Sequence, residues 1–479
     1  MNELRLNCTR ALKAAMAAVQ PYERVREALR LNSHTLQVGA KTYKVSKNIH
    51  LAAFGKAALG MVQGAESVLH DHLVEGIASV PRGTIKKIPH DFHFITKFYE
   101  GATNNLPDDD SCKNASRIEE MAKALHSNDE ILLCLLSGGG SALLSAPIYS
   151  ITLEDKLKAI KALTSRGADI KQLNTVRKYL SRLKGGKLAQ IAHPARVITI
   201  MVSDVVGDPI NFIGSGPTVP RDCTLFEEHN PIKVIKSLGA WEDTPLSVQQ
   251  ALKRSVTANV RNDDVDVNNL IVCNNQLALQ GIANKLKCSG YESHIVSSTI
   301  TLEAQDFGQR LARIIKESLT GKSFKESLQL ADIPDADVEC LDSDHIALLF
   351  GGETTVKVKG KGKGGRNQEI VLSALSKLLD GQSGELKGEF ALMSGGTDGQ
   401  DGPTKAAGAV LTSDDLRFIE DNQRWDKKDV NTFLEKNDSY NFWKVFRDGA
   451  CHIVTGPSGT NVMDVQVLLL DKKVDIFTL

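Results

Sequence analysis

Short apolar runs recur along the chain, and each run ends in glycine or small polar residues before a segment with helical apolar spacing. The pattern is seen in IHLAAFGKAALGM, ILLCLLSGGGSALL, VITIMVSDVVGD, NLIVCNNQLALQGIANKL, HIALLFGGETTV and FALMSGGTDG. Unbroken apolar strands are typical of a parallel sheet buried on both faces, and such sheets collect function at the carboxyl ends of their strands. The pattern therefore predicts an α/β architecture with a site at the strand ends.

This pattern breaks at LADIPDADVECLDSD, residues 330–344, where a proline and six acidic residues occur. Because the glycine-rich motifs change character after this segment, we predict two domains, of residues 1–335 and 345–479. The start of the chain has helical apolar spacing with charges of both signs, which is typical of neither a signal peptide nor a transit peptide. We therefore expect the first helix to belong to the fold.

Composition excludes several classes of function. Lysine plus arginine equals aspartate plus glutamate at 58 each, and aromatic residues make up only 5% of the chain. The protein therefore has no net positive charge that would attract nucleic acid or an anionic membrane, and it has few aromatic rings for base stacking. The sequence has no run of eighteen apolar residues, so no membrane span is predicted. Its eight cysteines are scattered and form no C-x-x-C pair, which favours free thiols in a reducing compartment. We expect a soluble intracellular protein whose anion sites are local.

The glycine-rich loop after the second apolar run is the first candidate site, and it consists of Ser137, Gly138, Gly139, Gly140 and Ser141. Glycine lets the backbone approach a ligand closely, and amides at a helix start bind anions. A tight turn with close packing is the alternative. Because several glycine clusters recur at predicted strand ends, a phosphate or carboxylate cradle is favoured.

Two further segments of the first domain carry charge near predicted strand ends. Lys56 follows Gly55 in FGKAA, where a compact positive charge suits a phosphoryl group, although a solvated surface lysine is the alternative. In SDVVGDPINFIGSGPT, Asp204 and Asp208 could bind Mg²⁺ or accept a hydroxyl proton, and ordinary turn chemistry is the alternative.

The stretch QLNTVRKYLSRLKGGKLA, residues 172–189, is predicted to form a helix that ends at Gly185 and Gly186. Helical spacing places a polar, positively charged stripe along one face: Asn174, Arg177 or Lys178, Ser181 and Lys184. This stripe could bind an anion or could be a solvated basic face.

In the second domain, KGKGKGGRNQE contains G-x-G-x-x-G at Gly360, Gly362 and Gly365. A dinucleotide site is one interpretation, but lysines fill the gaps of the motif and favour a role in gathering negative charge. Arg366 offers a planar fork for a carboxylate or a phosphate.

The glycine-rich loop SGGTDGQDGPTKAAG carries Asp398 and Asp401. Their spacing matches only part of a calcium loop, so Mg²⁺ with phosphate is favoured.

Glycine-rich loops, basic residues and aspartates together suit phosphoryl transfer, which needs mainly positioning and positive charge around the moving group. Neither G-x-x-x-x-G-K-[ST] nor the H-R-D and D-F-G motifs occur, so neither familiar ATP scaffold is predicted. H-E-x-x-H and G-x-S-x-G are also absent from the sequence. The residues alone predict an anion-handling α/β enzyme.

Eight stretches resemble, in the same order, the glycerate kinases of the second structural class: FGKAA, LLSGGGSALL, LNTVRKYLSRLKGGKLA, SDVVGDPINFIGSGPT, GGETTV, GGRNQE, SGGTDGQDGPT and TGPSGTNVMD. The resemblance implies a large Rossmann-like N-terminal domain, a smaller leucine-rich C-terminal α/β domain of the MOFRL type, and an active site in the interdomain cleft. It also implies ATP-dependent phosphorylation of D-glycerate with Mg²⁺, the 2-phosphate being the usual product and the 3-phosphate the alternative.

The resemblance also implies roles for single residues. Lys56 and Arg366 match the two basic residues of the family's cleft, and Asp204 is expected to orient or deprotonate the attacking hydroxyl. We expect Arg366 to hold the carboxylate of glycerate. The other expected contacts are nucleotide phosphate to residues 137–141 and Lys184, substrate to Asn174, Arg177 and Ser215, and metal to Asp398 and Asp401.

Two other classes of function stay open at this point. A nicotinamide-dependent hydroxypyruvate or tartronate reductase would use the glycine motif at Gly360, and a non-catalytic sensor would bind a nucleotide or a sugar acid without turnover. Nucleic-acid binding ranks below both. The compartment is expected to be the cytoplasm, with the mitochondrion as the alternative.

Overall fold

The computed structural model describes residues 3–103, 106–220, 230–257, 265–333, 343–380 and 386–472. The chain forms two compact units. One unit is Pro21–Cys273, and the other joins Met1–Gln20 to Asn274–Leu479.

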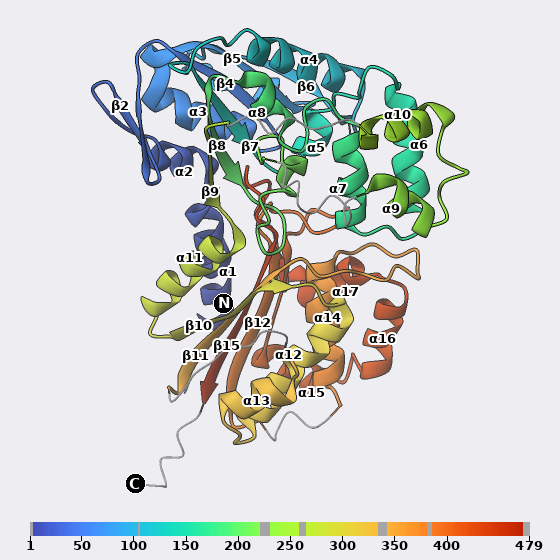
Figure 1. The fold of residues 1–479 in the computed structure, drawn as a ribbon. Helices are drawn as coiled ribbons and strands as arrows, with labels where there is room; N and C mark the ends of the chain where they lie inside the picture. Colours follow the sequence, from blue (N-terminus) through green and yellow to red (C-terminus); the bar gives the residue numbers. More distant parts are fainter. Residues whose placement is uncertain are drawn as a thin grey trace. The chain divides into compact units, whose positions relative to one another are not determined.

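A six-stranded sheet forms the centre of the Pro21–Cys273 unit, with strand order β6-β5-β4-β7-β8-β9 and parallel pairing throughout (Figure 1). Its strands are β4 (Ile49–Phe54), β5 (Leu73–Pro81), β6 (Thr96–Gly101), β7 (Ile131–Leu136), β8 (Arg196–Val202) and β9 (Val267–Cys273). Every residue of β4 and β7 is buried, as their unbroken apolar sequences predict. The chain runs outward from β4 to β6 and then outward from β7 to β9, so its topological switch point lies between β4 and β7. The predicted parallel α/β sheet is confirmed.

Helices and a small antiparallel sheet complete this unit. The helices are α2 (Pro21–Ala28), α3 (Ala58–Leu69), α4 (Asp109–Lys123), α5 (Gly140–Leu143), α6 (Leu153–Thr164), α7 (Ile170–Tyr179), α8 (Lys187–Ala192), α9 (Pro231–Ser237) and α10 (Leu246–Thr257). The small sheet contains β1 (Arg30–Asn32), β2 (Thr35–Val38) and β3 (Lys41–Lys44). Helices α6, α7, α9 and α10 bury a core of their own.

Helix α7 is shorter than predicted. It begins with a capping box in which Asp169 and Gln172 exchange hydrogen bonds, and it ends at Tyr179 rather than at the glycine pair. The Oγ atom of Ser181 accepts hydrogen bonds from the backbone amides of Leu183 and Lys184. Serine competes for backbone donors in this way and favours a turn over a helix. The prediction of one helix reaching the glycine pair was therefore wrong.

The second unit is built on a mixed sheet with strand order β10-β11-β15-β12-β13-β14, in which only β10 and β11 are parallel. The strands are β10 (Glu292–Ile300), β11 (His345–Gly352), β12 (Gly388–Gly396), β13 (Gly408–Thr412), β14 (His452–Ile453) and β15 (Asp464–Lys472). The expectation of a parallel sheet was wrong for this part of the chain. Its apolar runs reflect burial on both faces, which any strand direction allows.

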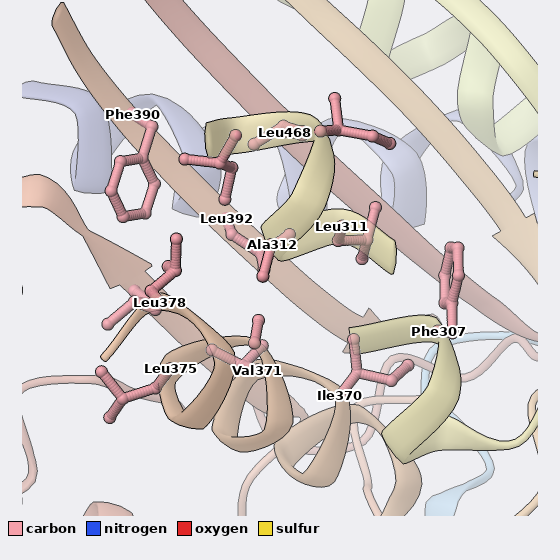
Figure 2. Packing of buried hydrophobic residues seen from close by; sticks show 14 of the residues in the cluster. Phe307, Leu311, Ala312, Ile370, Val371, Leu375, Leu378, Phe390, Leu392 and Leu468 are labelled. Carbon is pink, nitrogen blue, oxygen red and sulfur yellow. The ribbon is translucent and has the colours of Figure 1, made fainter. Parts of the chain in front are cut away.

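Helices cover both faces of this mixed sheet. Helices α1 (Glu3–Ala18) and α11 (Asn275–Lys287) pack together and against the sheet, and α12 (Ala304–Leu319) and α14 (Arg366–Leu378) form a second packed pair. Figure 2 shows Phe307 and Leu311 of α12 packing with Ile370 and Val371 of α14 and with the sheet residue Leu392. The remaining helices are α13 (Phe324–Leu330), α15 (Ser413–Asn422), α16 (Lys427–Glu435) and α17 (Ser439–Val445).

The two compact units differ from the predicted domains of residues 1–335 and 345–479. The segment 274–333 belongs with the C-terminal sheet, because β10 pairs with β11 and α12 packs on α14. The first helix belongs to the same unit, as it packs on α11. Within the predicted boundary, residues 334–342 lie outside the described residues. Among the helices that the structure describes, none has the length and hydrophobicity to cross a membrane.

Candidate functional site

Hydrogen bonds join the loops that follow β4 and β7 at the switch point. The Lys56 amide donates to the Gly138 carbonyl at 2.8 Å, and the Ala57 amide donates to the Ser137 Oγ at 3.0 Å. Gly55 has φ +140°, and a Cβ atom there would lie 2.1 Å from the Ser137 Oγ. Only glycine therefore allows this approach.

The loop after β8 brings a carboxylate to the same place. A Cβ atom on Gly138 would lie 2.1 Å from Asp204 Oδ2, so the aspartate sits directly against the glycine loop. Lys56 is exposed, and its side chain passes beside Gly139, where a Cβ atom would lie 3.3 Å from Lys56 Cγ. Burial raises the pKa of Asp204 above 3.8, and the positive charge of Lys56 opposes that rise. Three adjacent strand ends thus collect an ammonium group, a carboxylate and a glycine loop.

A chain of hydrogen bonds joins three more of the predicted residues. Ser141 Oγ and Ser215 Oγ lie 2.9 Å apart, and Ser215 Oγ donates to Asn174 Oδ1 at 3.0 Å. Ser215 has φ +66° and lies between two glycines that also have positive φ. The structure therefore brings Asn174 of α7 and Ser215 to the end of the glycine loop. Arg177 follows Asn174 by one helical turn and is half-buried.

Lys184 reaches the same loop from within the protein. Its side chain is 1% exposed, and its Nζ atom donates to the carbonyls of Ser141 and Leu144, each at 2.9 Å. Its ammonium group therefore holds the end of α5 and is turned toward backbone carbonyls rather than toward solvent.

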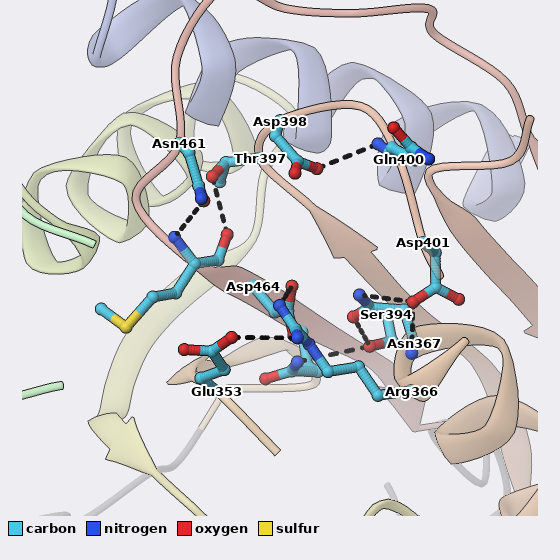
Figure 3. Close-up of polar contacts among 12 residues, drawn as sticks. Glu353, Arg366, Asn367, Ser394, Thr397, Asp398, Gln400, Asp401, Asn461 and Asp464 are labelled. Carbon is cyan, nitrogen blue, oxygen red and sulfur yellow. Dashed lines mark hydrogen bonds and ion pairs between the residues drawn. The ribbon is translucent and has the colours of Figure 1, made fainter. Parts of the chain in front are cut away.

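In the second unit, Arg366 is the first residue of α14 and is bound by two carboxylates (Figure 3). Its Nε and Nη2 atoms donate to both oxygens of Asp464, with the Nη2 to Oδ1 distance at 3.1 Å. Its Nη1 atom lies 3.0 Å from Glu353 Oε1. Asp464 is 1% exposed, so the pair is anchored in the interior. Sequence reasoning missed both carboxylates, because nothing in the local pattern pairs Arg366 with Glu353, 13 residues before it, or with Asp464, 98 residues after it.

The two aspartates predicted to bind Mg²⁺ have protein partners instead. Asp401 accepts four hydrogen bonds, from the backbone amides and side-chain amides of Asn367 and Gln368, at 2.8 to 3.2 Å. Burial raises its pKa to about 6. Asp398 accepts from the Gln400 amide at 3.0 Å. Asp401 thus anchors the start of α14, and the described ranges contain no group of three or more His, Cys, Asp and Glu side chains placed to hold a metal. The structure does not support the predicted metal pair.

The glycine motif at Gly360 is also occupied by the protein itself. The amides of Lys359 and Gly360 donate to Asn437 Oδ1 at 2.7 and 2.9 Å, and the Gly362 amide donates to the Lys436 carbonyl at 2.9 Å. A Cβ atom on Gly360 would lie 2.2 Å from that carbonyl oxygen. These glycines are needed for close backbone packing, and their paired amides do not form a dinucleotide cradle.

Comparisons with known proteins identify the family of the chain. Residues 7–253 match a family described as a domain of unknown function, DUF4147, and residues 346–464 match the MOFRL family. The chain is 38% identical to a glycerate kinase of Mus musculus, over 95% of this chain and 91% of that protein. It is 32% identical to a glycerate 2-kinase of Pyrococcus horikoshii, over 97% of both chains. The solved structure of a glycerate kinase from Thermotoga maritima matches with a TM-score of 0.79 and 32% identity, over 98% of this chain and 100% of that one. The chain belongs to the glycerate kinase family with DUF4147 and MOFRL domains.

Proposed function

We propose that this protein transfers the γ-phosphoryl group of ATP to a hydroxyl group of D-glycerate. The favoured product is 2-phospho-D-glycerate, and 3-phospho-D-glycerate is the alternative. The observation that carries the proposal is the meeting of Lys56, the glycine loop and Asp204 at the switch point of a parallel sheet. Membership of the glycerate kinase family supports it, and nothing in the comparisons favours a nicotinamide-dependent reductase or a sensor.

The glycine loop and the start of α3 are proposed to bind the phosphates of ATP. Helix α3 begins at Ala58, two residues after Lys56, and has no side-chain cap. The positive end of its dipole and the loop backbone favour negative charge at this point. Lys56 would then stabilise the charge on the γ-phosphoryl group as it moves. Lys184 would act indirectly, by holding the backbone carbonyls at the end of α5 in place.

Asp204 is proposed to accept the proton of the attacking hydroxyl group. The hydroxyl oxygen forms a bond to the γ-phosphorus, the bond from this phosphorus to the β,γ-bridging oxygen breaks, and ADP leaves with the bridging oxygen. Asn174 and Ser215 would hydrogen-bond the substrate at the end of the glycine loop. Mg²⁺ is proposed to enter with ATP as part of the co-substrate, because phosphate-bound Mg²⁺ needs only one or two protein carboxylates.

Arg366 is proposed as the second basic residue of the reaction. Three of its N–H groups face Asp464 and Glu353. A guanidinium has five such donors, so two are left for a phosphate oxygen.

We also propose a cytoplasmic location for the protein, with the mitochondrion as the alternative.

The experiment that tests the function is ADP release by the purified protein with MgATP and D-glycerate, with L-glycerate and no acceptor as controls. Release that depends on D-glycerate is expected, and phosphorus NMR of the product then gives the position. Coupling of phosphorus to one methine proton identifies the 2-phosphate, and coupling to a methylene identifies the 3-phosphate. Equal ADP release without D-glycerate would contradict the proposal.

Gly138→Ala is expected to lower kcat by at least about tenfold, because small misplacements of catalytic groups are costly. The new methyl group would overlap Asp204 Oδ2 and displace the proposed base. ADP release measures the effect. Gly83→Asn is the control, since Gly83 is exposed, a Cβ atom there meets nothing within 4 Å, and asparagine tolerates the left-handed backbone at φ +85°. Equal kcat for the two variants would argue against a role for Asp204 at this position.

The pH dependence of kcat/KM is expected to have an acid limb above the ordinary aspartate pKa of 3.8, because burial raises the pKa of Asp204. A base must be ionised, so activity is lost as the pH falls through this raised pKa. Asp204→Asn should lower kcat strongly and remove this limb from the residual activity. A profile that keeps the same limb in the variant would assign it to another group.

A further inference from the structure

Three basic side chains gather behind the glycine loop, and none has a carboxylate partner among the described residues. They are Lys156 of α6, Arg177 of α7 and Lys184. Lys156 is 4% exposed, and its Nζ atom lies 3.4 Å from Ser145 Oγ. Burial lowers the pKa of Lys156 to about 8, and repulsion from Arg177 lowers it further. The pKa of Lys184 is lowered by burial and by repulsion from the other two groups.

Two of the acidic residues near this basic cluster are engaged with other groups. Glu119 pairs with Arg182 at 2.8 Å and with Lys123 at 2.7 Å. Asp155 is the N3 residue of the α6 capping box, where it bonds the Thr152 amide, and it accepts a hydrogen bond from Ser247 at 3.0 Å. The Cys112 thiol lies near Lys156, but burial raises its pKa and keeps it neutral at pH 7. Among the described residues, no carboxylate therefore forms an ion pair with the cluster.

Arg177 is the member of the cluster that a ligand can reach. It is half-buried, and no described residue gives its guanidinium a hydrogen bond or an ion pair. It lies one turn after Asn174, whose side chain ends the hydrogen-bonded chain from Ser141 through Ser215. Buried charge without a partner costs free energy, and an anion bound at Arg177 would offset that cost.

We propose that Arg177, supported by the buried ammonium groups of Lys156 and Lys184, binds the carboxylate of the substrate. This inference rests on the proposed function for the identity of the substrate. The planar fork of Arg177 suits a carboxylate, whereas the fork of Arg366 is mostly occupied by Asp464 and Glu353. The subsite therefore selects small hydroxy acids over uncharged polyols, and it replaces the expected role of Arg366 in holding the carboxylate.

Arg177→Gln tests this subsite by steady-state kinetics. We expect the KM for D-glycerate to rise by about 10²-fold, the cost of removing one partner of a charged pair, with the KM for ATP nearly unchanged. Lys171→Gln is the matched control, because Lys171 is exposed on the same helix. A KM for D-glycerate within twofold of the wild-type value in Arg177→Gln would overturn the proposal.

Lys156→Met separates binding from a purely structural role. Removing one of three like charges should leave the Tm unchanged or raise it, while the KM for D-glycerate increases about tenfold. A lower Tm with an unchanged KM would instead mean that Lys156 only supports the fold, and would overturn its part in the subsite.

A binding measurement distinguishes this inference from the proposed function. D-lactate, which has the carboxylate but no 3-hydroxyl, should raise the Tm of the wild type and not that of Arg177→Gln, whereas glycerol should raise neither. If the wild type lacks D-glycerate kinase activity but shows this pattern, the proposed function fails and the anion subsite stands. If D-lactate raises the Tm of both proteins equally, the subsite fails even where the kinase activity is found.

Discussion

Replacing Lys56 by methionine is expected to lower the kcat of D-glycerate-dependent ADP release by about 10²- to 10³-fold, the typical loss on removing one well-placed donor. The side chain lies beside the glycine loop at the switch point, and its charge acts on Asp204. If Lys56 stabilises charge that develops during transfer, kcat falls and the KM for ATP changes little. Initial rates over a range of ATP concentrations separate the two constants.

The control for this variant is Lys47→Met, since Lys47 is exposed near the start of β4, at the opposite end of that strand from Lys56. Its kcat should equal that of the wild type. In Lys56→Met the acid limb of kcat/KM should also move to higher pH, because the ammonium group no longer opposes the raised pKa of Asp204. A variant with unchanged kcat and only weaker ATP saturation would exclude a transition-state role for Lys56.

The parallel sheet could be predicted from sequence because its strands are short, apolar and closed by glycine. The same reasoning led to Lys56, the glycine loop and Asp204, since carboxyl ends of neighbouring parallel strands meet at one edge of the sheet. What local pattern could not give was the direction of strands in the second unit. There β15 lies between β11 and β12, a pairing between segments more than a hundred residues apart in one case.

The electrostatic partners in the candidate site were equally hidden from sequence reasoning. Asp401 lies in a glycine-rich loop that suggested a metal ligand, but the structure uses its carboxylate to hold the start of α14. Lys156 lies in an ordinary amphipathic helix, and only its burial near Arg177 reveals an uncompensated charge. Each of these properties depends on contacts between distant segments.

The partly exposed guanidinium of Arg366 is held by the buried carboxylate of Asp464. Removing that carboxylate should destabilise the protein. We expect Asp464→Ala to lower the free energy of unfolding of this unit by about 3 kcal/mol, because the partly buried guanidinium then keeps only the exposed Glu353 as an ion-pair partner. Asp464 is 1% exposed and accepts from two nitrogen atoms of the guanidinium, at the first residue of β15. Urea unfolding followed by tryptophan fluorescence measures the loss, since Trp425 and Trp443 both belong to this unit.

Glu353→Gln is the matched control, because Glu353 binds the same guanidinium from an exposed position. Exposed ion pairs are worth about 0 to 1 kcal/mol, so this variant should unfold within that range of the wild type. Equal losses for the two variants would mean that burial does not set the strength of the pair. If instead Asp464→Ala unfolds like the wild type but loses kcat, Asp464 would serve to aim Arg366 without stabilising the fold, which would separate the two effects that the buried carboxylate is expected to combine.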